Sequence, residues 1–141
     1  MNFQELAQTL PNGFHDSELR NLEMDYVHRR LHLDLDVWIG EMKNADKREL
    51  YRPARLSLDK VAFLIIEPPD RRYDWLDPGS IRIDAGEGCP KQSSCSVPPI
   101  PAGSFSAYFY LGKLNSFLHV AAEYASLEWT GLEENRTQST K

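Results

Sequence analysis

The chain has 141 residues, of which 41% are apolar and 26% are charged, and its formal net charge is −5. Its length matches one domain of ordinary size, and its composition excludes a disordered chain and a membrane-spanning class. Residues 16–41 hold seven acids against three bases. A basic stripe typical of duplex-binding proteins is missing, so we expect no nucleic-acid partner.

The N-terminal segment lacks the basic start and the apolar stretch of a secretory signal, and no run of about 18 apolar residues occurs. We therefore expect a cytoplasmic protein with no membrane partner. Cys89 and Cys95 lie in a segment rich in Gly, Pro and Ser. Without an export signal we expect two free thiols, and the absence of a CxxC pair argues against zinc. No cofactor signature is present, and we expect no cofactor.

The first predicted element is a short N-terminal helix. Asn2 can cap it, and Glu5 stands three residues later as in a capping box. Pro11, Asn12 and Gly13 end it. One face of this helix is apolar and must pack on something else, and it is formed by Phe3, Leu6, Ala7 and Leu10.

Apolar and polar residues alternate from residue 17 onward, which predicts an antiparallel hairpin with one solvent-facing side. A two-residue turn at His28 and Arg29 would pair Tyr26 with Leu31. The same pairing would set Glu23 opposite Asp34, and like charges in that position are unfavourable. A longer turn or a bulge therefore remains open.

Further strands are predicted at 54–58, 61–66, 81–84, 105–111, 118–120 and 125–129. The first two of these flank Asp59 and Lys60 and predict a second hairpin, and the last two predict a final hairpin. The nearly continuous apolar run at 61–66 is typical of a strand covered on both faces. The tail at 133–141 has no apolar residue, and we expect it to be disordered.

These elements predict a single mainly β (α+β) domain over residues 1–132. About eight strands follow one another without a helical crossover. The simplest architecture is a curled antiparallel sheet, either an open barrel or a two-layer sandwich, with the short helix across one end.

One functional hypothesis is a small metal-dependent hydrolase that uses His15, Asp16, His32 and Asp34. Adjacent His and Asp form the metal-binding core of a phosphohydrolase superfamily, but that superfamily is helical and needs further His and Asp ligands. His32 and Asp34 would share a strand face about 7 Å apart and could bind one divalent ion. A capped turn at His15 and a solvated sheet face explain the same patterns, so we assign no metal site.

The leading hypothesis is a non-enzymatic protein-binding module, because acidic and aromatic residues are predicted on outer sheet faces. Tyr and Trp beside charges are typical of interface hot spots. The alternative is that the sheet buries both faces and these rings belong to the core. The predicted contact residues, for another protein or a second copy of this chain, are Glu23, Asp25, Asp34, Asp36, Trp38, Tyr108 and Tyr110.

A third hypothesis is a small-ligand carrier, since β-barrels can enclose an apolar molecule. The predicted lining residues would be Phe105, Phe109, Leu33 and Leu35. Their size favours a filled interior instead.

Three segments carry a resemblance to a known type of domain: residues 14–19, with the sequence FHDSEL; residues 31–37; and residues 115–118, with the sequence NSFL, before residues 125–129. They resemble small bacterial domains, some of them similar to immunity proteins of polymorphic toxin systems, which begin with a similar His-Asp hairpin. The resemblance implies a protein partner and a β-rich fold. It implies no catalytic residues, because that type of domain has no established active site.

Overall fold

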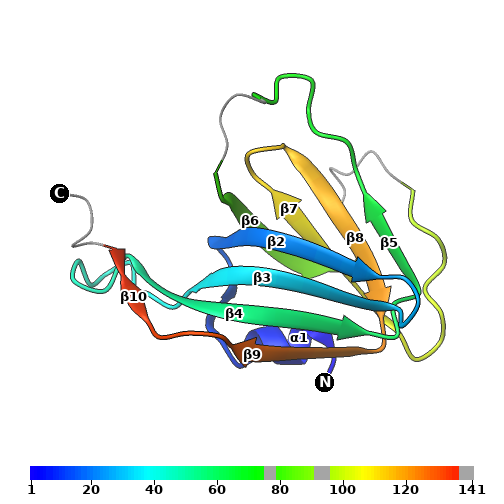
Figure 1. Ribbon diagram of the computed structural model, residues 1–141, viewed down its shortest axis with the longest axis horizontal. Coiled ribbons are helices and arrows are strands. Elements are labelled where there is room, and N and C mark those ends of the chain that lie inside the picture. The colour runs from blue at the N-terminus through cyan, green and yellow to red at the C-terminus, as the bar shows by residue number, and fades with distance from the viewer. Residues whose placement is uncertain (75–78, 91–95, 137–141) are drawn as a thin grey trace.

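The computed structural model describes residues 1–74, 79–90 and 96–136 (Figure 1). Within these residues the chain forms one helix and ten strands, and no helix is long and apolar enough to cross a membrane. The elements in chain order are α1 (Phe3–Gln8), β1 (Pro11–Phe14), β2 (Ser17–Asp25), β3 (Arg30–Trp38), β4 (Leu50–Asp59), β5 (Phe63–Ile66), β6 (Ile81–Glu87), β7 (Phe105–Leu111), β8 (Ser116–Ala122), β9 (Tyr124–Trp129) and β10 (Glu134–Asn135).

Nine of these strands form one antiparallel sheet that is not closed into a barrel. The strand order is β10-β4-β3-β2-β6-β7-β8-β5, and β9 also pairs with β4. In the described residues β2 and β6 pair through Ser17, Glu18 and Leu19 of β2. Figure 1 shows β2 and β3 crossing in front of β6, β7 and β8, so the sheet curls at this short junction. The predicted mainly β fold with a short N-terminal helix is confirmed.

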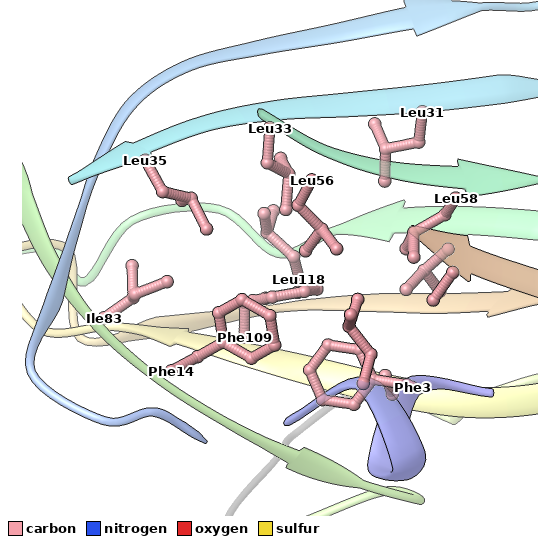
Figure 2. Packing of buried hydrophobic residues seen from close by; sticks show 14 of the residues in the cluster. Phe3, Phe14, Leu31, Leu33, Leu35, Leu56, Leu58, Ile83, Phe109 and Leu118 are labelled. Atoms are coloured by element: carbon pink, nitrogen blue, oxygen red, sulfur yellow. The ribbon is translucent and has the colours of Figure 1, made fainter. Parts of the chain in front are cut away.

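The core lies between the two halves of the curled sheet (Figure 2). Leu33 of β3 and Leu56 of β4 are fully buried, and both belong to the same apolar cluster as Phe109 of β7. Every second residue of β3 points inward, as the sequence alternation predicts. Phe105, Phe109, Leu33 and Leu35 are part of this packed cluster or lie against it, so the residues proposed to line a carrier cavity contribute to the core instead.

Helix α1 packs on this core as the sequence predicts. The backbone N–H of Glu5 donates to the Asn2 side chain at 2.8 Å, and the Asn2 backbone N–H donates to the Glu5 carboxylate at 3.3 Å, which completes the capping box. Phe3 is buried and stacks on Phe14 with ring centroids 5.2 Å apart.

The β2–β3 hairpin uses a longer turn and a bulge, the alternatives that the sequence left open. Residues 26–29 connect the strands, and a register shift lies between Leu19 and Asn21. The pairing of Tyr26 with Leu31 is therefore wrong, because Met24 pairs with Leu31. Asp34 lies opposite Asn21 instead of Glu23. The observed register avoids the like-charge pair.

The two later hairpins predicted from sequence adjacency do not form. β4 pairs with β9, and β5 pairs with β8, so strands exchange partners across the molecule. The chain passes between the two halves of the sheet at Lys60 and again at Glu123. These crossovers lie together, because the Glu123 backbone N–H donates to the Asp59 carbonyl at 3.1 Å and the Lys60 ammonium lies 3.7 Å from the Glu123 carboxylate.

Two further expectations differ from the structure. β5 pairs only with β8 among the described strands and is half-buried, with Ile66 60% exposed, so it is an edge strand and is not covered on both faces. The expected disorder from residue 133 is wrong for the part of the tail that is described. Glu134 and Asn135 form β10 against β4, and Arg136 binds neighbouring carboxylates.

Candidate binding pocket

The acidic residues of the β2–β3 hairpin are held by basic partners. Arg55 of β4 lies 3.0 Å from Asp34 and 3.3 Å from Glu23. The hydrogen bond from Arg55 is the main reason that the pKa of Asp34 lies below its ordinary value. Asp25 accepts the backbone N–H groups of Val27 and His28, and its side chain also contacts the His28 ring. The outer face of the β2–β3 hairpin therefore carries a network of ion pairs and not a patch of unpaired acids.

Asp36 and Trp38 are buried and are not available to a partner as exposed side chains. They are 6% exposed each. The outward direction predicted for Trp38 is occupied by the chain that follows, because its indole N–H donates to the Arg48 carbonyl at 2.7 Å. A Cβ atom on Gly40 would lie 2.6 Å from that indole nitrogen, so only a glycine at position 40 lets the backbone pack this closely against the Trp38 ring. Asp36 is bound by Arg20 at 2.9 Å.

The four residues of the hydrolase hypothesis do not come together. Asp34 binds Arg55, as described above, and His32 Nδ1 lies 2.8 Å from the Ser57 hydroxyl. His15 and Asp16 instead meet Asp84 of β6: His15 Nδ1 lies 2.7 Å from Asp84 Oδ1, and His15 Nε2 lies 3.3 Å from Asp16 Oδ2. The side chains of His15, Asp16 and Asp84 each offer one ligand atom within 4.8 Å of the others.

The contacts of His15 favour the charged form of its imidazole. Each ring nitrogen of His15 faces a carboxylate. The hydrogen bond to Asp84 is the main reason that the pKa of His15 lies above 6.5. An imidazolium donates from both nitrogens, whereas a metal ligand needs one nitrogen lone pair free for the ion.

Tyr108 and Tyr110 lie on the outer face of β7, opposite the core residues Ala107, Phe109 and Leu111. They line a pocket of about 510 Å³. We call it the aromatic pocket, and its described lining residues are Glu67, Asp84, Ala85, Pro90, Tyr108, Tyr110, Asn115 and Phe117.

Cross-strand pairing brings the rings of the aromatic pocket together. Tyr110 lies directly opposite Phe117 of β8, and their ring centroids are 5.1 Å apart at an angle of 51°. Tyr108 meets Phe117 edge-on at 5.8 Å. The three rings are half-buried and inclined to one another. They form a preorganised wall of the pocket because regular strand geometry sets their spacing.

The carboxylate of Glu67 is fixed at the side of the pocket. It accepts the Phe117 backbone N–H at 3.2 Å and contacts His119 Nε2 at 2.7 Å. His119 is 2% exposed and lies under the Phe117 ring, with ring centroids 6.0 Å apart. A carboxylate held from two directions keeps its position when a ligand enters.

Hydrogen bonds also fix another part of the rim. The Tyr110 hydroxyl donates to Asn115 Oδ1 at 2.7 Å, and the Asn115 amide donates to Asp70 Oδ2 at 3.1 Å. Hydrogen bonds from the Arg72 side chain, from its backbone N–H and from Asn115 hold the pKa of Asp70 well below its ordinary value. This chain of contacts fixes the Tyr110 ring and keeps Asp70 ionised.

Gly86 allows the Tyr108 ring to lie over β6. The two residues are paired across β6 and β7. A Cβ atom on Gly86 would stand 2.6 Å from the Tyr108 hydroxyl and 2.9 Å from a ring carbon. Any larger residue at position 86 would push this ring, so the glycine is part of the pocket's construction.

Sequence reasoning found Tyr108 and Tyr110 but missed Glu67, Asp84 and Phe117. Phe117 was named only within the NSFL segment of the resemblance, because the predicted strand began at residue 118. Its position opposite Tyr110 depends on the β7–β8 register. Glu67 follows β5, and only the non-local pairing of β5 with β8 brings it to Phe117. Cys89 is exposed and free, while Cys95 lies outside the described residues.

Comparison with protein-family models, curated proteins and solved structures finds no match to this chain.

Proposed function

We propose that this chain is a non-enzymatic protein-binding module whose contact surface is the aromatic pocket. The observation that carries the proposal is the set of three inclined rings, Tyr108, Tyr110 and Phe117, on the outer face of strands whose inner face is core. Rings that are half-buried before binding lose little freedom when a partner covers them. Such rings are typical anchors of interface hot spots.

The pocket supports this role better than the acidic hairpin does. A partner that approached Glu23 and Asp34 would compete with Arg55, which already binds both carboxylates. Breaking that pair would offset the energy gained from a new one. The partner is another protein or a second copy of this chain, and the resemblance to immunity proteins would make it a toxin domain.

Site-specific photo-cross-linking tests which surface meets the partner. We would replace Tyr110 by p-benzoylphenylalanine, and in a parallel protein we would replace Tyr26, which is 78% exposed in the β2–β3 turn. We expect the partner to be captured from position 110 and not from position 26. With the purified partner, Tyr110→Ala should weaken binding by about thirtyfold, as for a hot-spot residue. The matched control Tyr26→Ala should bind like the parent protein.

Two outcomes would contradict the proposal. A partner that cross-links from position 26 and binds Tyr110→Ala normally would place the contact surface elsewhere. Stoichiometric zinc or manganese in the purified protein, lost in His15→Ala, would favour the hydrolase hypothesis in a form built on His15, Asp16 and Asp84. Sedimentation of the protein alone separates self-association from binding to a different protein.

A further inference from the structure

The chemistry of the aromatic pocket indicates which group of the partner enters it. The pocket joins aromatic faces to carboxylates: Glu67 and Asp84 line it, and Asp70 is linked to its rim through Asn115. Among the described lining residues there is no Lys or Arg. The chain as a whole has a net charge of −5. Glu67 contacts His119 and Asp84 contacts His15, so both acids already have a partner. Neither histidine lines the pocket, and the lining itself carries two acids without a Lys or Arg among its described residues, which favours a positively charged ligand group.

The rings are arranged so that a cation can touch more than one of them. Tyr108 and Tyr110 both meet Phe117, at interplanar angles of 74° and 51°, so the rings do not lie in one plane. An ammonium or guanidinium group is attracted to the face of an aromatic ring, and the attraction increases when the group is shielded from water. Neutral apolar ligands would gain from the rings but nothing from the adjacent carboxylates.

Two other rings on the surface of the chain, those of Trp129 and Tyr124, are already paired with one of its own cations. Arg52 lies 4.7 Å from the centre of the Trp129 ring, and Lys60 lies 5.5 Å from the centre of the Tyr124 ring. For the rings of the aromatic pocket, the described residues supply no such cation. A partner can supply it.

We propose that the aromatic pocket binds an organic cation, the side chain of a lysine or an arginine on a basic surface of the partner. This proposal rests on the proposed function, and it adds the chemical group that is recognised. The rings contact the cation and its aliphatic stem, and the carboxylates of Glu67 and Asp84 supply the negative field. The aliphatic stem also covers the apolar surface of the rings.

Small probes test this chemistry without knowledge of the partner. We would titrate the protein with N-acetyl-arginine methylamide and N-acetyl-lysine methylamide, and compare them with the neutral citrulline and norleucine analogues. NMR shifts of the ring signals of Tyr108, Tyr110 and Phe117 report binding. We expect at least one cationic probe to bind about tenfold more tightly than its neutral analogue, and the two cationic probes show whether guanidinium or ammonium is preferred.

Three variants locate the effect. Tyr110→Leu removes one ring and should weaken the cationic probes by about tenfold. Tyr110→Phe keeps the ring and loses only the bond to Asn115, so it should retain most of the binding. Tyr124→Leu removes an exposed ring outside the pocket and should change nothing. A native amide spectrum for each variant shows that the fold is intact, and Tyr110→Phe remains informative if the leucine variant unfolds.

The possible results separate this inference from the proposed function. Equal binding of cationic and neutral probes, or no shifts in the pocket with any probe, overturns the inference. A partner that depends on Tyr110 but tolerates replacement of its contacting lysines and arginines by glutamine also overturns the inference and leaves the proposed function standing. If cationic probes bind the pocket but the partner does not contact it, the proposed function and the partner's side chain as the ligand are both refuted, and only the preference of the pocket for a cation remains.

Discussion

Arg136 is expected to anchor the described end of the C-terminal segment, and its removal gives a sharp test of the structure. Its guanidinium lies 2.6 Å from Glu18 and 2.7 Å from Asp36, and it stacks on the Tyr51 ring with its central carbon 4.2 Å from the ring centre. Its backbone N–H donates to the Glu49 carbonyl at 2.8 Å. Arg136→Gln removes the charge and leaves two carboxylates beside each other.

The loss of stability expected for Arg136→Gln depends on how deeply the ion pairs of Arg136 with Glu18 and Asp36 are buried. The side chain of Arg136 is 24% exposed, that of Glu18 is 16% exposed and that of Asp36 is 9% exposed. Removing one partner of a fully buried ion pair costs about 3–5 kcal/mol. Partial exposure and the remaining bond of Asp36 to Arg20 reduce this cost. We expect the free energy of unfolding to fall by about 2–3 kcal/mol, which corresponds to a fall in Tm of about 6–12 °C for a domain of this length.

Urea unfolding followed by tryptophan fluorescence, with calorimetry for Tm, measures the change. Arg30→Gln is the matched control, because Arg30 also pairs with an aspartate, Asp59, but both side chains are more exposed. We expect that control to change stability by less than about 0.5 kcal/mol. If Arg136→Gln costs no more than Arg30→Gln, then Arg136 does not anchor the C-terminal segment and this reasoning is refuted.

Three other predictions concern the His15 cluster, the pocket and the core. The stabilisation that His15 contributes should be complete below pH 6.5, and it should disappear as the pH rises through the raised pKa of His15 in the folded protein. An NMR titration should show that Asp84→Asn lowers the pKa of His15, and an unchanged pKa would refute Asp84 as the main cause of the shift. Gly86→Ala should shift the ring signals of Tyr108 and weaken binding to the pocket while the core stays folded, and an unmoved ring would contradict the close approach. Leu33→Ala should lower the free energy of unfolding by about 2–5 kcal/mol in urea, because Leu33 is 0% exposed, and a loss below about 1 kcal/mol would be inconsistent with the packing described.

The candidate site was only partly predictable. Strand alternation correctly placed Tyr108 and Tyr110 on the outer face of β7. It also placed Trp38 outward, and there the prediction of exposure was wrong. Alternation gives the side of a strand but not what covers that side, and here residues 40–49 fold back so that the Arg48 carbonyl meets the indole. The charges of Glu23 and Asp34 were likewise visible, whereas their partner Arg55 depends on which strand lies next to β3.

The sequence by itself determined the local structure. The capping box of Asn2 and Glu5 defines the start of α1, and the strict alternation around Leu33 defines a strand with one buried face. Both signals act between near neighbours in the chain, where propensity and hydrophobic period decide the outcome.

Only the tertiary structure decided which strands pair. The segments beside Lys60 and Glu123 read as hairpin turns, since short connections usually join neighbouring strands. Each instead carries the chain from one half of the sheet to the other, because β4 finds its partner in β9 and β5 finds its partner in β8. These pairings let both halves of the sheet bury their apolar faces in one core. The free energy gained by this burial depends on residues far apart in the chain, so it cannot be predicted from a local sequence pattern. The aromatic pocket depends in part on the same non-local choice. The local β7–β8 hairpin brings its rings together, but only the pairing of β5 with β8 brings Glu67 to them.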